Sequence, residues 1–299
     1  MNAPKEAPPP GSGIAHIIQP HARDLGDGFI VARMLPAIEK RMVGPFVFLD
    51  QFGPVTFAPG KVADVRPHPH IGLATVTYMF EGEIMHRDSI GSAQVIRAGE
   101  VNLMTAGRGI AHSERTPEHL RDTERTQFGL QFWVGLPTAL EEMPAAFAHH
   151  GADELPKLDV GDVKARLVLG TFMGQRSPVV TASETLLVDI DLPAGGRFTV
   201  PASHKERAIQ VVTGAITVGG AQIGAPRLAV LEEGREVVFQ ADASARCVVL
   251  GGDPLDGPRH LWWNFVSSSK ERIEQAKVDW KEGRFATIAG ETEFIPLPE

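Results

Sequence analysis

A long succession of short β-prone runs, separated by turn residues, constrains this chain more than any other feature. From about residue 45 the runs include PFVFLDQFGP, ATVTYMFEGE, AQVIRAGEV and QFGLQFWVGL, and a second series extends from KARLVLGTF to RCVVLGG. Short strands at such spacing are typical of β-sandwiches and β-barrels. Gly 31 and Pro 23 among 299 residues supply the turns, so an all-β fold is predicted and a helical bundle is disfavoured.

A polar, proline-containing interval, PTALEEMPAAFAHHGADELPKLDVG, separates the two series of runs. It predicts two domains joined by a linker. The expected organisation is a disordered tail over residues 1–13, an N-terminal domain over 14–137, a linker over 138–161 and a C-terminal domain over 162–299. The tail assignment follows from four prolines and two glycines in MNAPKEAPPPGSG, a composition that cannot bury a core.

The clearest helix signal lies near the C-terminus, in SKERIEQAKVDWKEG. Ser268 or Ser269 is a suitable N-cap, and Gly283 is a suitable stop. Ile273, Ala276 and Trp280 recur on one face of this helix, which predicts that the helix packs against the rest of the domain.

The two halves of the chain also repeat weakly. Residues 80–84 (FEGEI) correspond to 212–216 (VTGAI), and residues 98–106 (AGEVNLMTA) correspond to 233–241 (EGREVVFQA) at nearly the same offset. The matched order of the two pairs predicts duplication of one β-barrel unit.

Charge and cysteine content exclude several classes of function. The net charge of -8 and the pI of about 5.8 provide no basic surface for nucleic acid. Cys247 is the one cysteine, so no internal disulfide is available and a cytosolic location is expected. The chain contains neither a signal-like apolar segment near its start nor a run of about 18 apolar residues, so no membrane association is predicted.

Two histidine-containing pairs carry the chemistry. His68 and His70 in RPHPHIG stand at positions i and i+2, and His112 and Glu114 in IAHSE repeat that spacing. Because alternate side chains of a strand share one face, each pair points in one direction. Gly107 and Gly109, just before the second pair, permit a close backbone approach.

If the two strands face each other inside a barrel, three imidazoles and one carboxylate converge on a point. Such a set suits Fe(II), and also Mn, Ni, Cu or Zn. The alternative is that these histidines are ordinary polar residues of the surface or core.

At these positions the chain resembles the cupin superfamily and, more closely, the pirin family. The matching stretches are VGPFVFLDQFGP (43–54), RPHPHIGLATVTYMFEGE (66–83), HRDSIGSAQVIRAGEVNLMTAGRGIAHSE (86–114), GLQFWVGLP (129–137) and HLWWNFVSSSKERIEQAKVDW (260–280). The resemblance implies two tandem jelly-roll-like cupin barrels with a short C-terminal helix, in a monomer. It also implies one iron-type site in the N-terminal barrel, held by His68, His70, His112 and Glu114.

The chain departs from the family pattern at Ala74, where many pirins carry a carboxylate. Since Glu114 resembles the fourth ligand of pirins, the metal is expected to stay bound without an acid at position 74. The C-terminal half lacks the ligand set. Aligned through the repeat, its positions fall near Val200, Ala202, Cys247 and Val249, with His204 as the one nearby imidazole, so no second metal site is expected. A packing role is expected for Cys247.

Five other side chains stand out. His86 is expected to be a structural histidine, with a hydrogen bond to a ligand as the alternative. His149 and His150 are expected to be solvent-exposed in the linker. Trp262 and Trp263 are expected to pack with the terminal helix.

The resemblance to pirins implies two alternative functions. The first is a quercetin 2,3-dioxygenase that opens the ring of a flavonol-like aromatic substrate with dioxygen, in which Glu114 takes the proton of the substrate hydroxyl. The second is a non-catalytic iron protein whose redox state governs binding to a protein partner. The acidic charge favours a protein over DNA as that partner.

Overall fold

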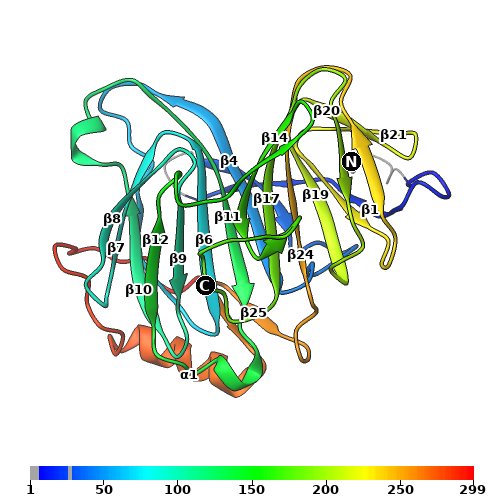
Figure 1. Cartoon of the computed structure of the whole chain (residues 1–299). Helices are drawn as coiled ribbons and strands as arrows, with labels where there is room; N and C mark the ends of the chain where they lie inside the picture. Colours follow the sequence, from blue (N-terminus) through cyan, green and yellow to red (C-terminus); the bar gives the residue numbers. More distant parts are fainter. Residues whose placement is uncertain (1–6, 26–28) are drawn as a thin grey trace. The chain divides into compact units, whose positions relative to one another are not determined.

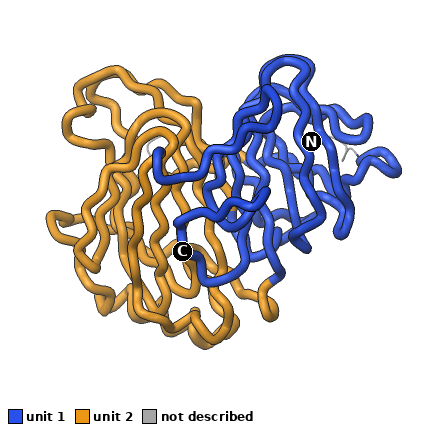
Figure 2. The backbone as a smooth tube through the Cα atoms, in the orientation of Figure 1, with its two compact units in different colours: residues 1–21, 32–48, 153–254 blue, residues 22–31, 49–152, 255–299 orange. Residues whose placement is uncertain are grey.

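The computed structural model describes residues 7–25 and 29–299, and most of the regular structure is β-strand (Figure 1). The described residues fall into two compact units (Figure 2). Unit 1 comprises the described parts of residues 1–21, 32–48 and 153–254, and unit 2 those of residues 22–31, 49–152 and 255–299. Neither unit is one continuous segment, in contrast to the predicted domains 14–137 and 162–299.

Two sheets form the β-structure associated with unit 2. The seven-stranded sheet has the order β12 (Ala146–His150), β9 (Val101–Thr105), β6 (Leu73–Glu81), β11 (Arg125–Gly135), β4 (Phe46–Phe57), β3 (Ile30–Leu35) and β2 (His21–Asp24). The four-stranded sheet has the order β5 (Val65–His70), β10 (Ile110–Arg115), β7 (Glu83–Asp88) and β8 (Ala93–Arg97).

Unit 1 repeats this arrangement. Its seven-stranded sheet has the order β1 (Ile14–Ile18), β22 (Arg227–Leu231), β19 (Glu206–Thr213), β24 (Ala245–Gly252), β17 (Thr185–Leu192), β14 (Val163–Leu169) and β13 (Lys157–Val160). Its four-stranded sheet has the order β18 (Arg197–Val200), β23 (Val237–Gln240), β20 (Ala215–Val218) and β21 (Ala221–Gly224). The shared topology confirms the predicted all-β fold with a duplicated barrel.

The smaller elements are short connections. The 3-10 helices are η1 (Glu118–Leu120) and η2 (Thr138–Leu140), and the two short hairpins are β15 (Thr171–Phe172) with β16 (Gln175–Arg176) and β25 (His260–Trp262) with β26 (Phe265–Ser267).

The first strand of the described residues, β1, and two runs of the predicted linker are parts of sheets. β1 pairs with β22 of unit 1. β12, which lies within the predicted linker 138–161, pairs with β9, and β13 pairs with β14. Both runs therefore satisfy their backbone groups at a sheet edge. The boundary between the two units, at residues 152 and 153, lies within the predicted linker, and the domain bounds stay a prediction. The residues of these runs carry no local sequence signal that identifies their partner strands.

The predicted disordered tail falls partly outside the described residues, which begin at residue 7. Its described end is ordered against unit 1. Ser12 is buried and its hydroxyl accepts a hydrogen bond from the Ile14 amide at 3.3 Å. The Gly13 carbonyl accepts one from the Glu232 amide at 2.9 Å. Residues 12 and 13 thus extend the ordered region that begins at β1.

The predicted C-terminal helix is confirmed as α1 (Lys270–Lys281). Ser269 is its N-cap and accepts a hydrogen bond from the Arg272 amide at 3.2 Å, and Gly283 follows its end with a φ of 68°. Apolar side chains of the helix and the preceding hairpin form one cluster with the residue that follows β5: Ile71, Trp262, Trp263, Phe265, Ile273, Ala276 and Trp280. This confirms the packing predicted for the two tryptophans. In the described residues no helix is both long and apolar enough to cross a membrane.

Arg207 on β19 is among the largest fully buried side chains, with 1% of its surface exposed. Its guanidinium donates to the carbonyls of Pro201 at 2.8 Å, Arg235 at 2.9 Å and Glu232 at 2.7 Å. A hydrogen bond that involves a charged group contributes about 1.5–3 kcal/mol, and the guanidinium of Arg207 is itself buried. We therefore expect Arg207→Met to lower the free energy of unfolding by about 3 kcal/mol or more, as measured by urea denaturation.

Arg235→Met is the matched control, because the Arg235 side chain is exposed and pairs with Glu232 at 2.9 Å at the surface. Its expected cost is below about 1 kcal/mol. Equal losses in the two variants would contradict the structural role of the buried guanidinium.

Candidate metal centre

Three buried histidines meet where β5 and β10 pair. His68 and His70 extend from the same face of β5, as their i, i+2 spacing predicts, and His112 lies directly opposite His68 on β10. The ring centroids are 4.3 Å apart for His68 and His112, and 5.0 Å apart for each of the other two pairs. One nitrogen of each ring lies within 4.8 Å of the others. In the part of the chain that the structure describes, this is the one group with metal-ligand spacing.

Two glycines allow the strand ends around this cluster to come together. Gly72 follows β5 and Gly107 precedes β10, and the Gly72 amide donates to the Gly107 carbonyl at 2.8 Å. Both have positive φ, 66° and 53°. A Cβ would lie 2.0 Å from the Val266 carbonyl oxygen at Gly72, and 2.0 Å from the Met143 carbonyl oxygen at Gly107. The close approach predicted for Gly107 is therefore confirmed.

Backbone carbonyls orient the first two imidazoles. The His68 Nδ1 donates to the Arg66 carbonyl at 2.9 Å, and the His70 Nδ1 donates to the Asn264 carbonyl at 3.1 Å. Since a carbonyl only accepts, the ring proton of each neutral imidazole is on Nδ1. The Nε2 lone pair of each ring is then left for a metal, as in most protein metal sites.

A third chain of contacts leads away from His112. Its Nδ1 faces the Nδ1 of His86 on β7 at 3.4 Å, and the His86 Nε2 faces the Asp88 carboxylate at 3.0 Å. His86 is buried and stacks on Phe147 of β12, with ring centroids 4.5 Å apart. His86 therefore has buried partners on both ring nitrogens, as expected of a structural histidine.

Burial keeps the three clustered imidazoles neutral. Loss of solvation lowers the pKa of His68 to about 4 and, with the neighbouring rings, lowers the pKa of His70 and His112 well below the usual value. Neutral imidazole is the form that binds metals. Hydrogen bonds from His86 and Ser92 hold the pKa of Asp88 below its usual range, although burial opposes its ionisation.

The fit to a metal rests on the shared position of these lone pairs. The Nε2 atoms of His70 and His112 are 3.1 Å apart. With the ring proton of His70 on Nδ1, its lone pair faces the His112 nitrogen at short range, an arrangement that a shared cation or proton stabilises. The three ring nitrogens are a donor set that suits a divalent transition metal.

Glu114 lies on β10 beyond a register shift after His112. It is partly buried and does not belong to the group of three nitrogens within 4.8 Å. Its Oε1 is 3.4 Å from the Thr77 hydroxyl, which also lies 2.9 Å from Gln131 Oε1. Burial raises the pKa of the Glu114 carboxyl, although His86 and Thr77 oppose this. Its predicted role as fourth ligand stays a prediction.

Sequence reasoning did not identify several neighbours of the site. Asp88 had a usable signal, because His86 and Asp88 stand at i and i+2 on one strand. Asn264 and Trp133 had no such signal, because both contact His70 from distant segments. The Asn264 carbonyl accepts from His70, and the Trp133 ring lies 5.2 Å from the His70 ring.

The exposed position predicted for His149 and His150 is wrong. Both lie on β12 and are partly buried. The His149 Nδ1 lies 2.8 Å from the Asn102 side-chain oxygen on β9. The pairing of β12 with the sheet, rather than a linker conformation, accounts for the difference.

The segment after α1 contacts the outer side of the ligand strands. Glu291 accepts hydrogen bonds from Ser113 at 2.7 Å and from Arg115 at 3.1 Å, both on β10. The Ile295 amide donates to the Pro67 carbonyl of β5 at 2.8 Å. The C-terminal segment therefore supports the two strands that carry the histidines.

Unit 1 has apolar residues at the equivalent positions. In unit 2 His112 pairs with His68, and in unit 1 the equivalent strands pair Val237 with Val200. Likewise Glu114 pairs with His86, and Phe239 pairs with Val218. These four unit 1 side chains are buried in its core, which leaves no ligand atom for a metal.

The alignment of His112 with Cys247 and Glu114 with Val249 is therefore wrong. Residues 98–106 include β9, whereas residues 233–241 include β23, so the second sequence match joined strands of different sheets. Cys247 lies on β24 and packs in the core of unit 1, as predicted, and burial raises the pKa of its thiol.

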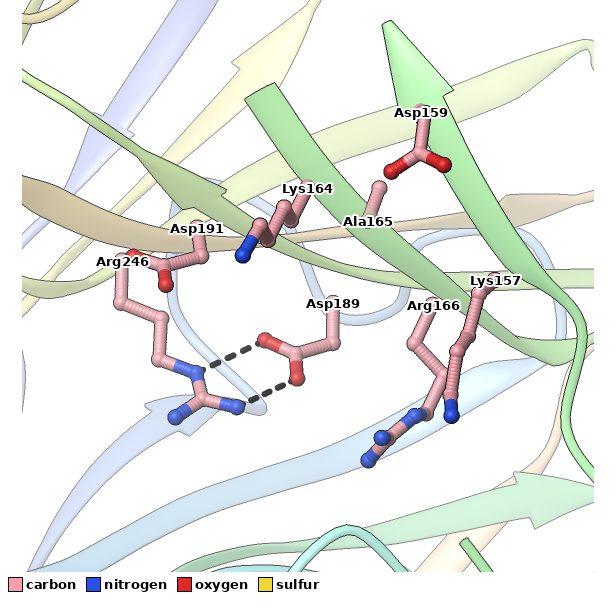
Figure 3. Close-up of a pocket in the computed structure, with 8 residues that line it drawn as sticks. All are labelled: Lys157, Asp159, Lys164, Ala165, Arg166, Asp189, Asp191 and Arg246. Atoms are coloured by element: carbon pink, nitrogen blue, oxygen red, sulfur yellow. Dashed lines mark hydrogen bonds and ion pairs between the residues drawn. The ribbon is translucent and has the colours of Figure 1, made fainter. Parts of the chain in front are cut away.

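A cavity of about 280 Å³ in unit 1 is lined by charged side chains (Figure 3). Its lining is Lys157, Asp159, Lys164, Ala165, Arg166, Asp189, Asp191 and Arg246. Arg246 forms two hydrogen bonds with Asp189, at 2.9 and 2.5 Å. Across the strands Asp159 pairs with Lys164, which pairs with Asp191. The lining has four cationic and three acidic side chains, so most of its charges offset one another, and it holds no metal-ligand cluster.

Comparison with known proteins agrees with the geometry. The Pirin family model matches residues 28–134, and the model described as Pirin C-terminal cupin domain matches residues 187–286. A pirin-like protein of Caulobacter vibrioides is 51% identical over 281 residues, which cover 93% of this chain and 96% of that protein.

Solved structures show the same fold. The crystal structure of quercetin 2,3-dioxygenase from Acinetobacter baumannii has a TM-score of 0.89 and 34% identity, covering 95% of both chains. The bacterial pirin YhhW from Escherichia coli, solved in complex with nickel(II), has a TM-score of 0.62 and 18% identity, covering 80% of this chain and 99% of that one. The two family models and the 51% identical relative, together with two barrels of one topology and a three-histidine centre in unit 2, show that the chain belongs to the pirin family.

Proposed function

We propose that this protein is an iron-dependent dioxygenase that opens the ring of quercetin or a related flavonol at the His68, His70 and His112 centre. The observation that carries the proposal is the convergence of three buried, neutral imidazoles at the pairing of β5 and β10. The similar crystal structure of quercetin 2,3-dioxygenase supports the choice of substrate class.

The bound metal supplies open coordination positions for a chelating substrate and for dioxygen, and lowers the pKa of a hydroxyl that binds to it. The three imidazoles would hold the ion. Hydrogen bonds from His68 and His70 to backbone carbonyls fix two of the rings, so their Nε2 atoms would stay oriented toward the ion.

Glu114 is the proton acceptor in this proposal. Its partly buried carboxyl has a raised pKa, which brings it closer to that of a hydroxyl activated by a metal. Thr77 has one hydroxyl proton and two acceptor neighbours, the oxygens of Glu114 and Gln131. When Glu114 carries the proton, it donates to the Thr77 oxygen while Thr77 donates to Gln131, so every group has a partner.

The test is anaerobic mixing of the iron-loaded protein with quercetin, followed by addition of oxygen. The expected results are a shift of the flavonol absorption band without oxygen, and oxygen uptake with carbon monoxide release after its addition. Glu114→Gln should retain the metal but lower turnover by about 100-fold or more, the range typical of a lost general base.

An intact, metal-loaded protein that shifts no band and takes up no oxygen would overturn the enzymatic proposal. It would favour the alternative in which the iron redox state governs binding to a protein partner. Elemental analysis of protein purified from its own host tests the choice of iron, since N/O sites accept several metals.

A further inference from the structure

The contacts of His112 define the direction of a hydrogen-bond chain. Asp88 Oδ1 accepts from the amides of Ile90 at 3.1 Å and Ser92 at 2.9 Å, so this carboxylate acts as an acceptor. Its other oxygen, Oδ2, lies 3.0 Å from His86 Nε2. A carboxylate oxygen in this position accepts a proton donor, which places the ring proton of His86 on Nε2.

The proton positions of the other hydrogen bonds in this series follow from that assignment. A neutral His86 with its proton on Nε2 has a lone pair on Nδ1, and this atom faces His112 Nδ1 at 3.4 Å. His112 must then donate from Nδ1, and its Nε2 is left without a proton. That Nε2 is the atom 3.1 Å from His70 Nε2. All three histidines therefore present an unprotonated Nε2 to the centre. Backbone carbonyls hold the proton of His68 and His70 on Nδ1, and the contacts from Asp88 through His86 do the same for His112.

The surroundings hold this chain in one geometry. His86 and Asp88 are both buried, with 4% and 2% of their surfaces exposed. The His86 ring stacks on Phe147 at an interplanar angle of 17°, so the ring cannot turn without losing that contact. β10 and β7 are paired, with His112 opposite Asp88 and Glu114 opposite His86.

We propose that Asp88 and His86 form a positioning pair that sets the tautomer of His112 and so prepares its Nε2 for the metal. Neither residue belongs to the group of nitrogens that would hold the metal. The inference rests on the metal site of the proposed function, but it does not depend on flavonol chemistry.

Asp88→Asn reverses the direction of the hydrogen bonds through His86 to His112, while the side chain at position 88 keeps nearly the same shape. The two backbone amides keep the Asn oxygen on their side, so the side-chain NH₂ faces His86 Nε2. His86 then accepts on Nε2 and donates from Nδ1, which forces His112 to accept on Nδ1 and to carry its proton on Nε2. That proton competes directly with the metal. Loss of such outer partners typically lowers metal affinity by about 10–100-fold, and we expect a loss in this range.

The test measures two quantities for the full-length protein. Competition titration with a chelator gives the Kd for Ni²⁺, and ¹⁵N NMR of labelled histidines in the metal-free protein gives the tautomer of His112. We expect Asp88→Asn to raise the Kd by about 10–100-fold and to move the His112 proton from Nδ1 to Nε2. His86→Phe keeps the stack on Phe147 and should also weaken Ni²⁺ binding, which provides a second test if Asp88→Asn does not fold.

Asp64→Asn is the matched control. Asp64 also accepts a backbone amide just after β10, from Thr116 at 2.8 Å, and pairs with Arg121 at 2.8 Å, but none of these partners is a clustered histidine. It should leave the Kd and the tautomer unchanged. An unchanged Kd in Asp88→Asn, or a raised Kd with the His112 proton still on Nδ1, would overturn the proposal. If the unaltered protein fails to bind Ni²⁺, the metal site itself fails, whereas the NMR measurement still tests the pair.

Discussion

His112→Ala is expected to lower the affinity of the protein for divalent metals by more than about 100-fold, since loss of outer partners alone costs about 10–100-fold. The imidazole is nearly fully buried, with 1% of its surface exposed, and no other described side chain offers a nitrogen at that point. Two of the three clustered nitrogens remain, and Glu114 lies outside that cluster, so the site falls below the three protein ligands of a stable transition-metal site. The measurement is metal content after dialysis together with a competition titration.

His204→Ala is the matched control for this variant. His204 is also a buried histidine, with 6% of its surface exposed, but it lies in unit 1 and contacts Ser203 and Glu184. It should retain the metal. Retention by both variants would show that the metal binds elsewhere, and loss from both would indicate a general defect in folding.

Acid is expected to destabilise the metal-free protein between pH 6.5 and about 4. The pKa of His68 is about 4 in the folded protein and near 6.5 when the chain is unfolded. The unfolded chain therefore binds more protons in this window, and stability falls as the pH falls. At pH 5 the loss from His68 alone is about 2 kcal/mol relative to pH 7.5. His70 and His112 add losses in the same direction.

Urea denaturation of chelator-treated protein at several pH values measures this loss. The pKa of the buried Asp88 carboxyl is lowered from its ordinary value near 3.8, so Asp88 titrates below this window and contributes little within it. His68→Gln removes one of the titrating rings and should reduce the dependence on pH. The same dependence in both proteins would contradict a buried, neutral His68.

The ligand histidines were predictable because their signal is local. Because side chains alternate along a strand, His68 and His70 lie on one face regardless of how the strand pairs with its neighbours. The helix α1 was predictable for the same reason, since Ser269 and Gly283 mark its ends in the sequence itself.

The unpredicted features are non-local. A strand's own residues do not specify its neighbour, so the pairing of β1 with β22 and of β12 with β9 could not be deduced from either run. The Asn264 carbonyl that orients His70 is 194 residues away. The second repeat match failed because a similar turn and strand occur in both kinds of sheet, and short patterns do not distinguish them.

The most direct test of the metal centre is an anomalous-scattering map of crystals grown with one equivalent of a divalent transition metal. We expect one strong peak about 2.1 Å from the Nε2 atoms of His68, His70 and His112. A peak bound through Nδ1 of any of these rings, or a peak away from them, would contradict the account.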